Sequence, residues 1–129
     1  MKFAKVVFWI AGGWGVLVLT PLYFIYDKIG VQDPPPITHP AFYYGFAGVA
    51  MVWQFAFLVI GSEPARFRPV MILAVLEKFT YGVTLAVLYL QGRLHVPDFA
   101  LGGIDTFLGI LFVVAFLKTG TAVRAGAQS

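Results

Sequence analysis

Four long apolar segments constrain this chain more than any motif does. They cover residues 6–26, 42–61, 70–91 and 101–118, and stretches rich in turn-forming residues separate them. A helix needs about 20 apolar residues to cross the ~30 Å hydrocarbon core of a bilayer. We therefore predict an all-α, polytopic membrane protein. A single domain over residues 1–129 would form an antiparallel bundle of four transmembrane helices.

Composition supports lipid as the surrounding solvent. Sixty per cent of the residues are hydrophobic and 12% are charged, against roughly 25% charged residues in soluble domains. Apart from Lys78, the nine Lys and Arg residues are scattered near segment ends, and together they form no basic stripe, so we expect membrane lipids and no nucleic acid as partners. The chain has no cysteine, which excludes thiol nucleophiles and thiolate metal sites within it. No motif indicates a metal or a cofactor, and we expect none.

The distribution of positive charge predicts an orientation. One side of the predicted bundle carries six Lys and Arg residues and the other side carries two. Short cytoplasmic loops are enriched in Lys and Arg, so both termini and the second loop are expected in the cytoplasm, across a bacterial inner (plasma) membrane. The six are Lys2, Lys5, Arg66, Arg68, Lys118 and Arg124, and the two are Lys28 and Arg93.

Small residues at helical spacing predict where the helices pack. Close approach between helices in lipid relies on small side chains, because the surrounding tails are as apolar as the helices themselves. Each segment has such a pair, which we expect to lie at helix contacts. The pairs are Ala11 with Gly15, Gly45 with Gly48, Gly82 with Ala86, and Gly102 with Gly109.

Three polar residues fall deep within the second and third segments, namely Gln54, Glu77 and Lys78. A charge at the centre of a membrane helix costs roughly 2.5–3.5 kcal/mol on insertion scales, so Glu77 should face the protein interior. Its carboxyl could accept hydrogen bonds from Gln54, a tryptophan or the adjacent lysine, or be protonated. Lys78 lies about 100° around the helix from Glu77. It could reach the headgroups or pair with a carboxylate on another helix.

Asp105 in the fourth segment extends this set toward the opposite side of the membrane. Glu77, Tyr81 and Thr84 share one helical face that could link the two carboxylates. Such a polar track could carry a proton or hold a lipid-like ligand, or it could be the ordinary interior seam of a bundle. The candidate intramembrane polar site consists of Gln54, Glu77, Lys78, Tyr81, Thr84 and Asp105.

Arg66 and Arg68 lie in the second loop, next to the predicted cytoplasmic interface. They are interpreted either as anchors that fix the topology or as binders of a phosphate headgroup.

Several short motifs resemble a group of small bacterial membrane proteins. They are Phe42-Tyr43-Tyr44-Gly45-Phe46, Trp53-Gln54, Arg66-Phe67-Arg68-Pro69, Leu76-Glu77-Lys78, Tyr81-Gly82, Gly92-Arg93, Asp105 and Leu108-Gly109-Ile110-Leu111-Phe112. The group comprises four-helix integral membrane proteins of unassigned activity, similar in architecture to the DoxX-like proteins. The resemblance covers about two thirds of the chain, and it implies a fold without an activity.

Three functions fit these residues. The first is an accessory subunit of a larger membrane complex or a bundle that binds a lipophilic ligand, alone or as a homo-oligomer. The second is an enzyme acting on a lipid or quinone, with Glu77 or Asp105 as general acid or base. The third is a proton-coupled small-molecule transporter acting as an oligomer. A cavity open to lipid beside Glu77 would favour the enzyme, and a closed, dry bundle would favour the accessory role.

Overall fold

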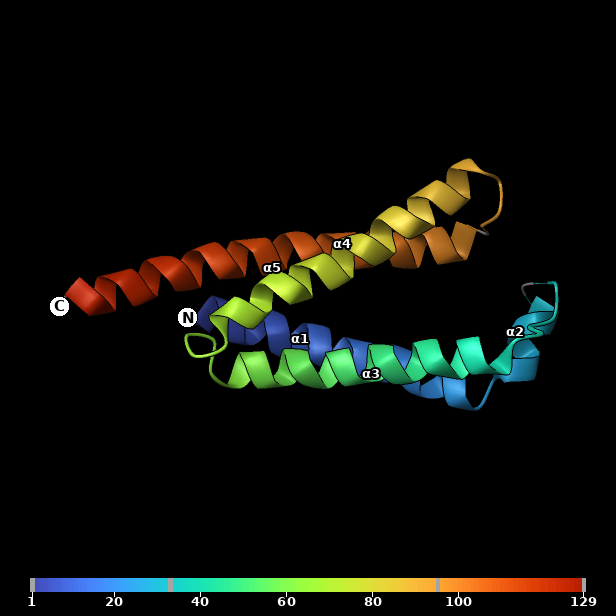
Figure 1. Cartoon of the computed structure of the whole chain (residues 1–129), viewed down its shortest axis with the longest axis horizontal. Helices are drawn as coiled ribbons and strands as arrows, with labels where there is room; N and C mark the ends of the chain where they lie inside the picture. Colours follow the sequence, from blue (N-terminus) through green and yellow to red (C-terminus); the bar gives the residue numbers. More distant parts are fainter. Residues whose placement is uncertain (1, 33, 95, 129) are drawn as a thin grey trace.

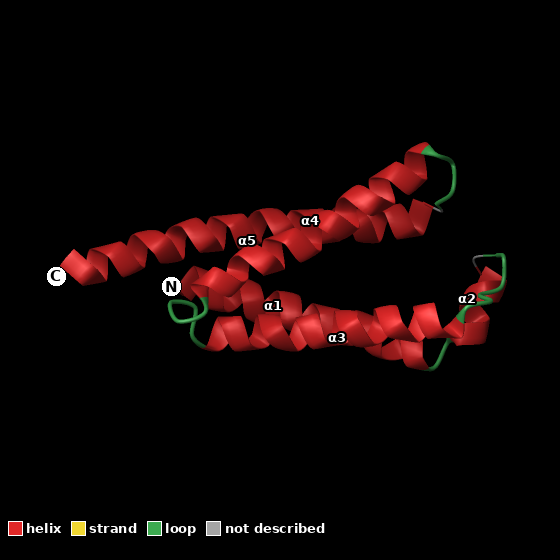
Figure 2. Cartoon of the chain, viewed as in Figure 1, coloured by secondary structure: helices red, strands yellow, loops and turns green. Residues whose placement is uncertain are grey.

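The computed structural model describes residues 2–32, 34–94 and 96–128, and the regular structure in them is helical (Figure 2). The helices are α1 (Lys2–Leu19), η1 (Thr20–Tyr23), α2 (Tyr26–Gln32), α3 (Pro40–Ser62), α4 (Arg68–Leu90) and α5 (Val96–Gln128). No strand occurs among these residues. This arrangement confirms the predicted all-α class.

Four of the helices are long and apolar enough to cross a bilayer, as the sequence predicts. These spans are Lys2–Tyr23, Pro40–Ser62, Arg68–Leu90 and Asp98–Gly126. At a rise of ~1.5 Å per residue, the 23 residues of α3 measure about 35 Å, enough for a hydrocarbon core of ~30 Å. A helix satisfies its own backbone hydrogen bonds, which lipid cannot do.

The first span differs from its predicted form near its end. Regular α-helix stops at Leu19, and a single 3₁₀ turn, η1, continues to Tyr23. Pro21 accounts for the change, because it has no N–H to donate to the preceding turn and its ring crowds that turn. The short helix α2 (Tyr26–Gln32) follows, and apart from Tyr26 its residues were not predicted to be helical.

The last helix is longer than predicted, since α5 begins at Val96 and continues to Gln128. The sequence prediction marked only the apolar stretch 101–118. The residues beyond it include Ala122, Arg124 and Ala125, which have high intrinsic helix propensity.

The helices associate as two pairs. α1 packs on α3 and α4 packs on α5, while the pairs meet mainly through α1 and α5; α3 and α4 touch little. In Figure 1 the two pairs diverge toward the end that carries α2 and the α4–α5 turn. Trp9 of α1 donates from Nε1 to the Leu58 carbonyl of α3 at 3.2 Å, which ties the first pair together.

The α4–α5 turn depends on Gly92. Its φ of +69° lies in the left-handed region, which only glycine adopts without strain. The backbone N–H of Gly92 donates to the Tyr89 carbonyl at 3.0 Å, and that of Arg93 donates to the Leu88 carbonyl at 2.9 Å. These two bonds form a Schellman motif, which satisfies carbonyls at the end of α4.

An aromatic core joins the two pairs. Phe8 of α1 stacks on Phe112 of α5 with ring centroids 4.3 Å apart, and Phe57 of α3 meets Phe112 edge-on at 5.0 Å. All three side chains are fully buried. Offset and edge-on ring contacts of this kind stabilise beyond simple burial. The core therefore lies where α1, α3 and α5 come together.

The predicted packing glycines are partly confirmed. Four of them lie so close to a neighbouring helix that an added Cβ would approach its side chains more closely than ordinary van der Waals contact allows. They are Gly15, Gly82, Gly102 and Gly109. Gly45 is different, because a Cβ there would meet nothing within 4 Å. The prediction that Gly45 packs against a helix is therefore wrong.

Candidate functional site

Lys78 lies at the centre of the polar residues inside the membrane spans. Its side chain is 4% exposed, and Nζ donates to Asp105 Oδ1 of α5 at 3.3 Å. Nζ also lies 3.8 Å from Glu77 Oε2 on its own helix. The ammonium is 5.1 Å from the centre of the Phe57 ring, within the range of a cation–π contact. Lys78 thus pairs with a carboxylate on another helix and does not reach the headgroups.

A glycine allows this ion pair to form. A Cβ at Gly109 of α5 would lie 3.1 Å from the Cβ of Lys78, tighter than ordinary van der Waals contact. The absence of that Cβ brings the α5 backbone close to α4 at the level of Lys78. Asp105, one turn before Gly109 on α5, then lies within reach of the ammonium.

Gln54 of α3 is the second buried polar group. It is 3% exposed, and its Nε2 donates to the Ala50 carbonyl at 2.9 Å. Its Oε1 has no hydrogen-bond partner among the described residues. The amide lies directly against Gly15 of α1, where a Cβ would overlap it. A small residue at position 15 is therefore needed for Gln54 to lie inward.

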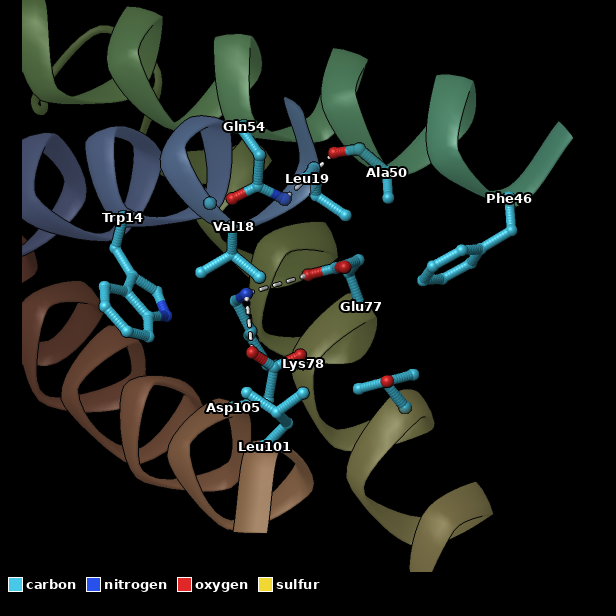
Figure 3. Close-up of a pocket in the computed structure, with 12 residues that line it drawn as sticks. Trp14, Val18, Leu19, Phe46, Ala50, Gln54, Glu77, Lys78, Leu101 and Asp105 are labelled. Atoms are coloured by element: carbon cyan, nitrogen blue, oxygen red, sulfur yellow. Dashed lines mark hydrogen bonds and ion pairs between the residues drawn. The ribbon is translucent and has the colours of Figure 1, made fainter. Parts of the chain in front are cut away.

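A cavity of about 80 Å³ separates Gln54 from the Lys78 ion pairs. Figure 3 shows Lys78 reaching between Glu77 and Asp105, with Gln54 on a neighbouring helix and Trp14 on α1 nearby. A single water needs roughly 10–15 Å³ of such space, so the cavity has room for several waters or a small polar group. Its walls are Trp14, Gly15, Val18, Leu19, Phe46, Ala50, Gln54, Glu77, Lys78, Tyr81, Leu101 and Asp105.

An open groove of about 680 Å³ runs beside this cavity between α3 and α4. Four residues line both spaces: Phe46, Ala50, Glu77 and Tyr81. The rest of the groove is largely apolar, and Gly45, whose missing side chain leaves open space, is part of its wall. The further lining residues are Val49, Trp53, Leu73, Leu76, Thr80 and Thr84.

The structure brings together five of the six predicted polar residues. Gln54, Glu77, Lys78, Tyr81 and Asp105 all line the cavity. Thr84 does not; it lies in the groove, and its hydroxyl donates to the Thr80 carbonyl of its own helix at 2.8 Å. The polar residues thus form a compact cluster around Lys78 and no continuous track reaching Thr84.

The two interfacial arginines differ in their surroundings. The Arg66 side chain is 73% exposed and pairs with Glu63 at 3.4 Å. Arg68 instead is half-buried and packs against α5: its Nε donates to the Phe116 carbonyl at 2.9 Å, and its guanidinium lies 3.8 Å from the Phe116 ring centre. Arg68 therefore joins the start of α4 to α5, and Arg66 is the one whose charge faces outward.

Several residues around the cavity lie outside the predicted site. Trp14, which the sequence suggested only as a possible hydrogen-bond donor to Glu77, lines the cavity with Phe46 and Ala50, and the Phe57 ring contacts the Lys78 ammonium. The only sequence signal for them was helical spacing: Phe46, Ala50 and Gln54 are four residues apart and so share one face of α3. That pattern is common in any buried helix and did not mark a site.

The cluster has an unbalanced formal charge. Two carboxylates and one ammonium line the cavity, so with all three ionised the sum is −1. Asp105 lies closer to Lys78 than Glu77 does, and Glu77 Oε2 makes no hydrogen bond to a described residue. The Glu77 carboxylate is thus the less compensated charge and the group most available to a ligand.

Comparisons with protein-family models, with curated proteins and with solved structures find no match to this chain. The resemblance to DoxX-like proteins stays a prediction.

Proposed function

We propose that this chain is a multi-pass membrane protein that binds an amphiphilic, lipid-like ligand. The observation that carries the proposal is the shared wall between the polar cavity and the apolar groove, formed by Phe46, Ala50, Glu77 and Tyr81. A ligand with a polar head and an apolar tail matches both spaces at once. The head would enter the cavity near Lys78, and the tail would lie along the groove.

Physical chemistry favours this division. Binding sites for small molecules are mostly apolar with a few polar groups that fix orientation. The groove supplies the apolar surface, and it is open rather than enclosed. Entry from the bilayer would then not require the tail to pass through water. The buried polar groups, which gain nothing from lipid, would gain hydrogen bonds from the head.

Substitution of Ala50 tests the proposal. Ala50→Phe places a ring in the wall that the two spaces share, so a head could no longer reach the cavity. We expect binding of dodecyl amphiphiles to weaken by at least about tenfold, equivalent to ~1.4 kcal/mol. Binding is measured as saturable retention by phosphatidylcholine nanodiscs that contain the full chain, above retention by empty nanodiscs.

Val52→Phe is the matched control, because Val52 is 64% exposed on the same helix. It adds an aromatic side chain of the same size outside both spaces and should leave retention unchanged. If both variants lose retention of the amphiphile equally, or if neither loses it, a ligand site at Ala50 would be contradicted.

We also propose that both termini face the cytoplasm of a bacterial cell. The six-to-two charge asymmetry supports this orientation. Figure 1 draws the two termini and the α3–α4 turn toward one end and α2 toward the other, which is the shared side that the proposal requires of the termini.

Single cysteines test the orientation on a chain that has none. Pro36→Cys and Arg66→Cys both replace exposed residues. A membrane-impermeant maleimide added to intact cells should label position 36 and leave position 66 unlabelled until the cells are opened. Labelling of both positions in intact cells, or of position 66 alone, would overturn the proposed topology.

A membrane enzyme acting on the same ligand is the second candidate. The observation that favours it is Glu77, whose Oε2 is buried at the cavity without a hydrogen-bond partner in the described part of the chain. A carboxylate in that position is suited to take a proton from a bound hydroxyl or amine. Mass spectrometry of the retained amphiphile separates the candidates, since binding alone returns it intact. The accessory-subunit and transporter hypotheses require another chain or a second copy, and they stay predictions.

A further inference from the structure

The cavity presents hydrogen-bond acceptors that lack donors. Gln54 Oε1 and Glu77 Oε2 are both buried, and neither has a hydrogen-bond partner among the described residues. Gln54 and Glu77 line the same cavity from α3 and α4. A buried acceptor without a partner is unfavourable, and most such groups in native proteins are satisfied by protein, water or ligand. The missing partner at this cavity is therefore a donor.

The charge of the cavity specifies the donor further. Lys78 is engaged with Asp105 at 3.3 Å, which leaves the Glu77 carboxylate, at 3.8 Å from the ammonium, as the less compensated group. A negative charge that is only partly compensated inside a membrane is costly, and a second cation placed beside it relieves that cost. A neutral alcohol would supply one O–H and no charge, and an anionic head would be repelled.

The aromatic walls agree with a positive ligand. Trp14, Phe46 and Tyr81 line the cavity, and ring faces attract cations within about 6 Å. The protein already uses one ring in this way, because the Lys78 ammonium lies 5.1 Å from the centre of Phe57.

We propose that the head group bound here is a primary ammonium, so that the ligand is a lipophilic amine. This inference rests on the proposed function and names its ligand class. An ammonium has three N–H donors, enough for Gln54 Oε1 and Glu77 Oε2 with one left for water. It also brings the formal charge of the occupied cavity to zero. A cavity of about 80 Å³ accommodates a head of this size.

Four probes with the same dodecyl tail test the proposal at neutral pH, in nanodiscs of phosphatidylcholine that contain the full chain. They are dodecylamine, dodecyltrimethylammonium, dodecanol and dodecanoate. We expect dodecylamine to bind at least about tenfold more tightly than each of the others. The trimethylammonium probe keeps the charge without N–H donors, and dodecanol keeps a donor without charge.

Glu77→Gln extends the test to the residue that carries the argument. It should reduce dodecylamine affinity about tenfold while leaving dodecanol unchanged, since glutamine keeps the shape and removes the charge. Glu63→Gln is the matched control, because the Glu63 side chain is 55% exposed and pairs with Arg66 at the surface, away from the cavity. It should change neither affinity.

The outcomes separate the two proposals. If no probe is retained above empty nanodiscs, the proposed binding function fails, and the amine inference fails with it. If probes bind but dodecanol or dodecanoate matches dodecylamine, the site stands and the amine inference is overturned. Equal affinity of dodecyltrimethylammonium would overturn the N–H donor requirement, and an unchanged dodecylamine affinity in Glu77→Gln would overturn the role of Glu77.

Discussion

Lys78→Met is expected to lower the free energy of unfolding by about 3–5 kcal/mol, the usual cost of removing one partner from a buried ion pair. Methionine fills a similar volume without the charge. The side chains of Glu77 and Asp105, 22% and 20% exposed, would then face each other without a cation between them. Unfolding by dodecyl sulfate in mixed micelles, followed by tryptophan fluorescence, measures the loss.

Two further variants identify the cause of the stability loss in Lys78→Met. Lys28→Met removes a lysine from an exposed position on α2 and should change stability by no more than ~0.5 kcal/mol. Combining Lys78→Met with Glu77→Gln and Asp105→Asn removes both stranded carboxylates and should recover most of the loss. A triple variant as unstable as Lys78→Met alone would show that the lysine acts through packing and not through charge.

Adjacent glycines in α1 should respond oppositely to the same substitution. A Cβ at Gly12 would lie 2.9 Å from the Gln54 carbonyl oxygen and 2.8 Å from two atoms of Leu58. Backbone cannot yield as a side-chain end can, so Gly12→Ala should force α1 away from α3 and cost about 1–3 kcal/mol. At Gly13 a Cβ meets nothing within 4 Å, and Gly13→Ala should stabilise by up to ~1 kcal/mol through helix propensity.

The same unfolding measurement compares the two alanine variants. A second readout follows from geometry: the loss of contact in Gly12→Ala should weaken the Trp9 hydrogen bond to Leu58 and shift the tryptophan emission, whereas Gly13→Ala should not. Equal stability of the two variants would contradict the close α1–α3 contact at Gly12.

Much of the fold could be predicted because lipid restricts the choices. An apolar stretch of sufficient length has to be a helix there, so four spans follow from hydropathy. The details that were not predicted have causes that a hydropathy pattern does not contain. The break after Leu19 comes from the proline ring, and α2 is too short and too polar to show in a hydropathy pattern.

The site was predictable in its residues and less so in its arrangement. Glu77, Lys78 and Asp105 stand out because each charge is costly in a span. Their grouping around the lysine depends on how closely α4 approaches α5, which Gly109 decides. Helical spacing placed Thr84 beside Glu77 and Tyr81, but spacing cannot show which part of a face opens into a cavity and which into a groove.

The pairing of helices also bears on how the chain assembles. Each pair consists of two membrane spans that follow one another in the sequence: α1 with α3, and α4 with α5. Each pair can therefore enter the bilayer and close as a hairpin on its own. Lys78 and Asp105 both belong to the second hairpin, so their charges can pair within that hairpin without a contribution from α1 or α3. We therefore expect the docking of α1 on α5, which seats Phe8 against Phe112, to follow the pairing of Lys78 with Asp105.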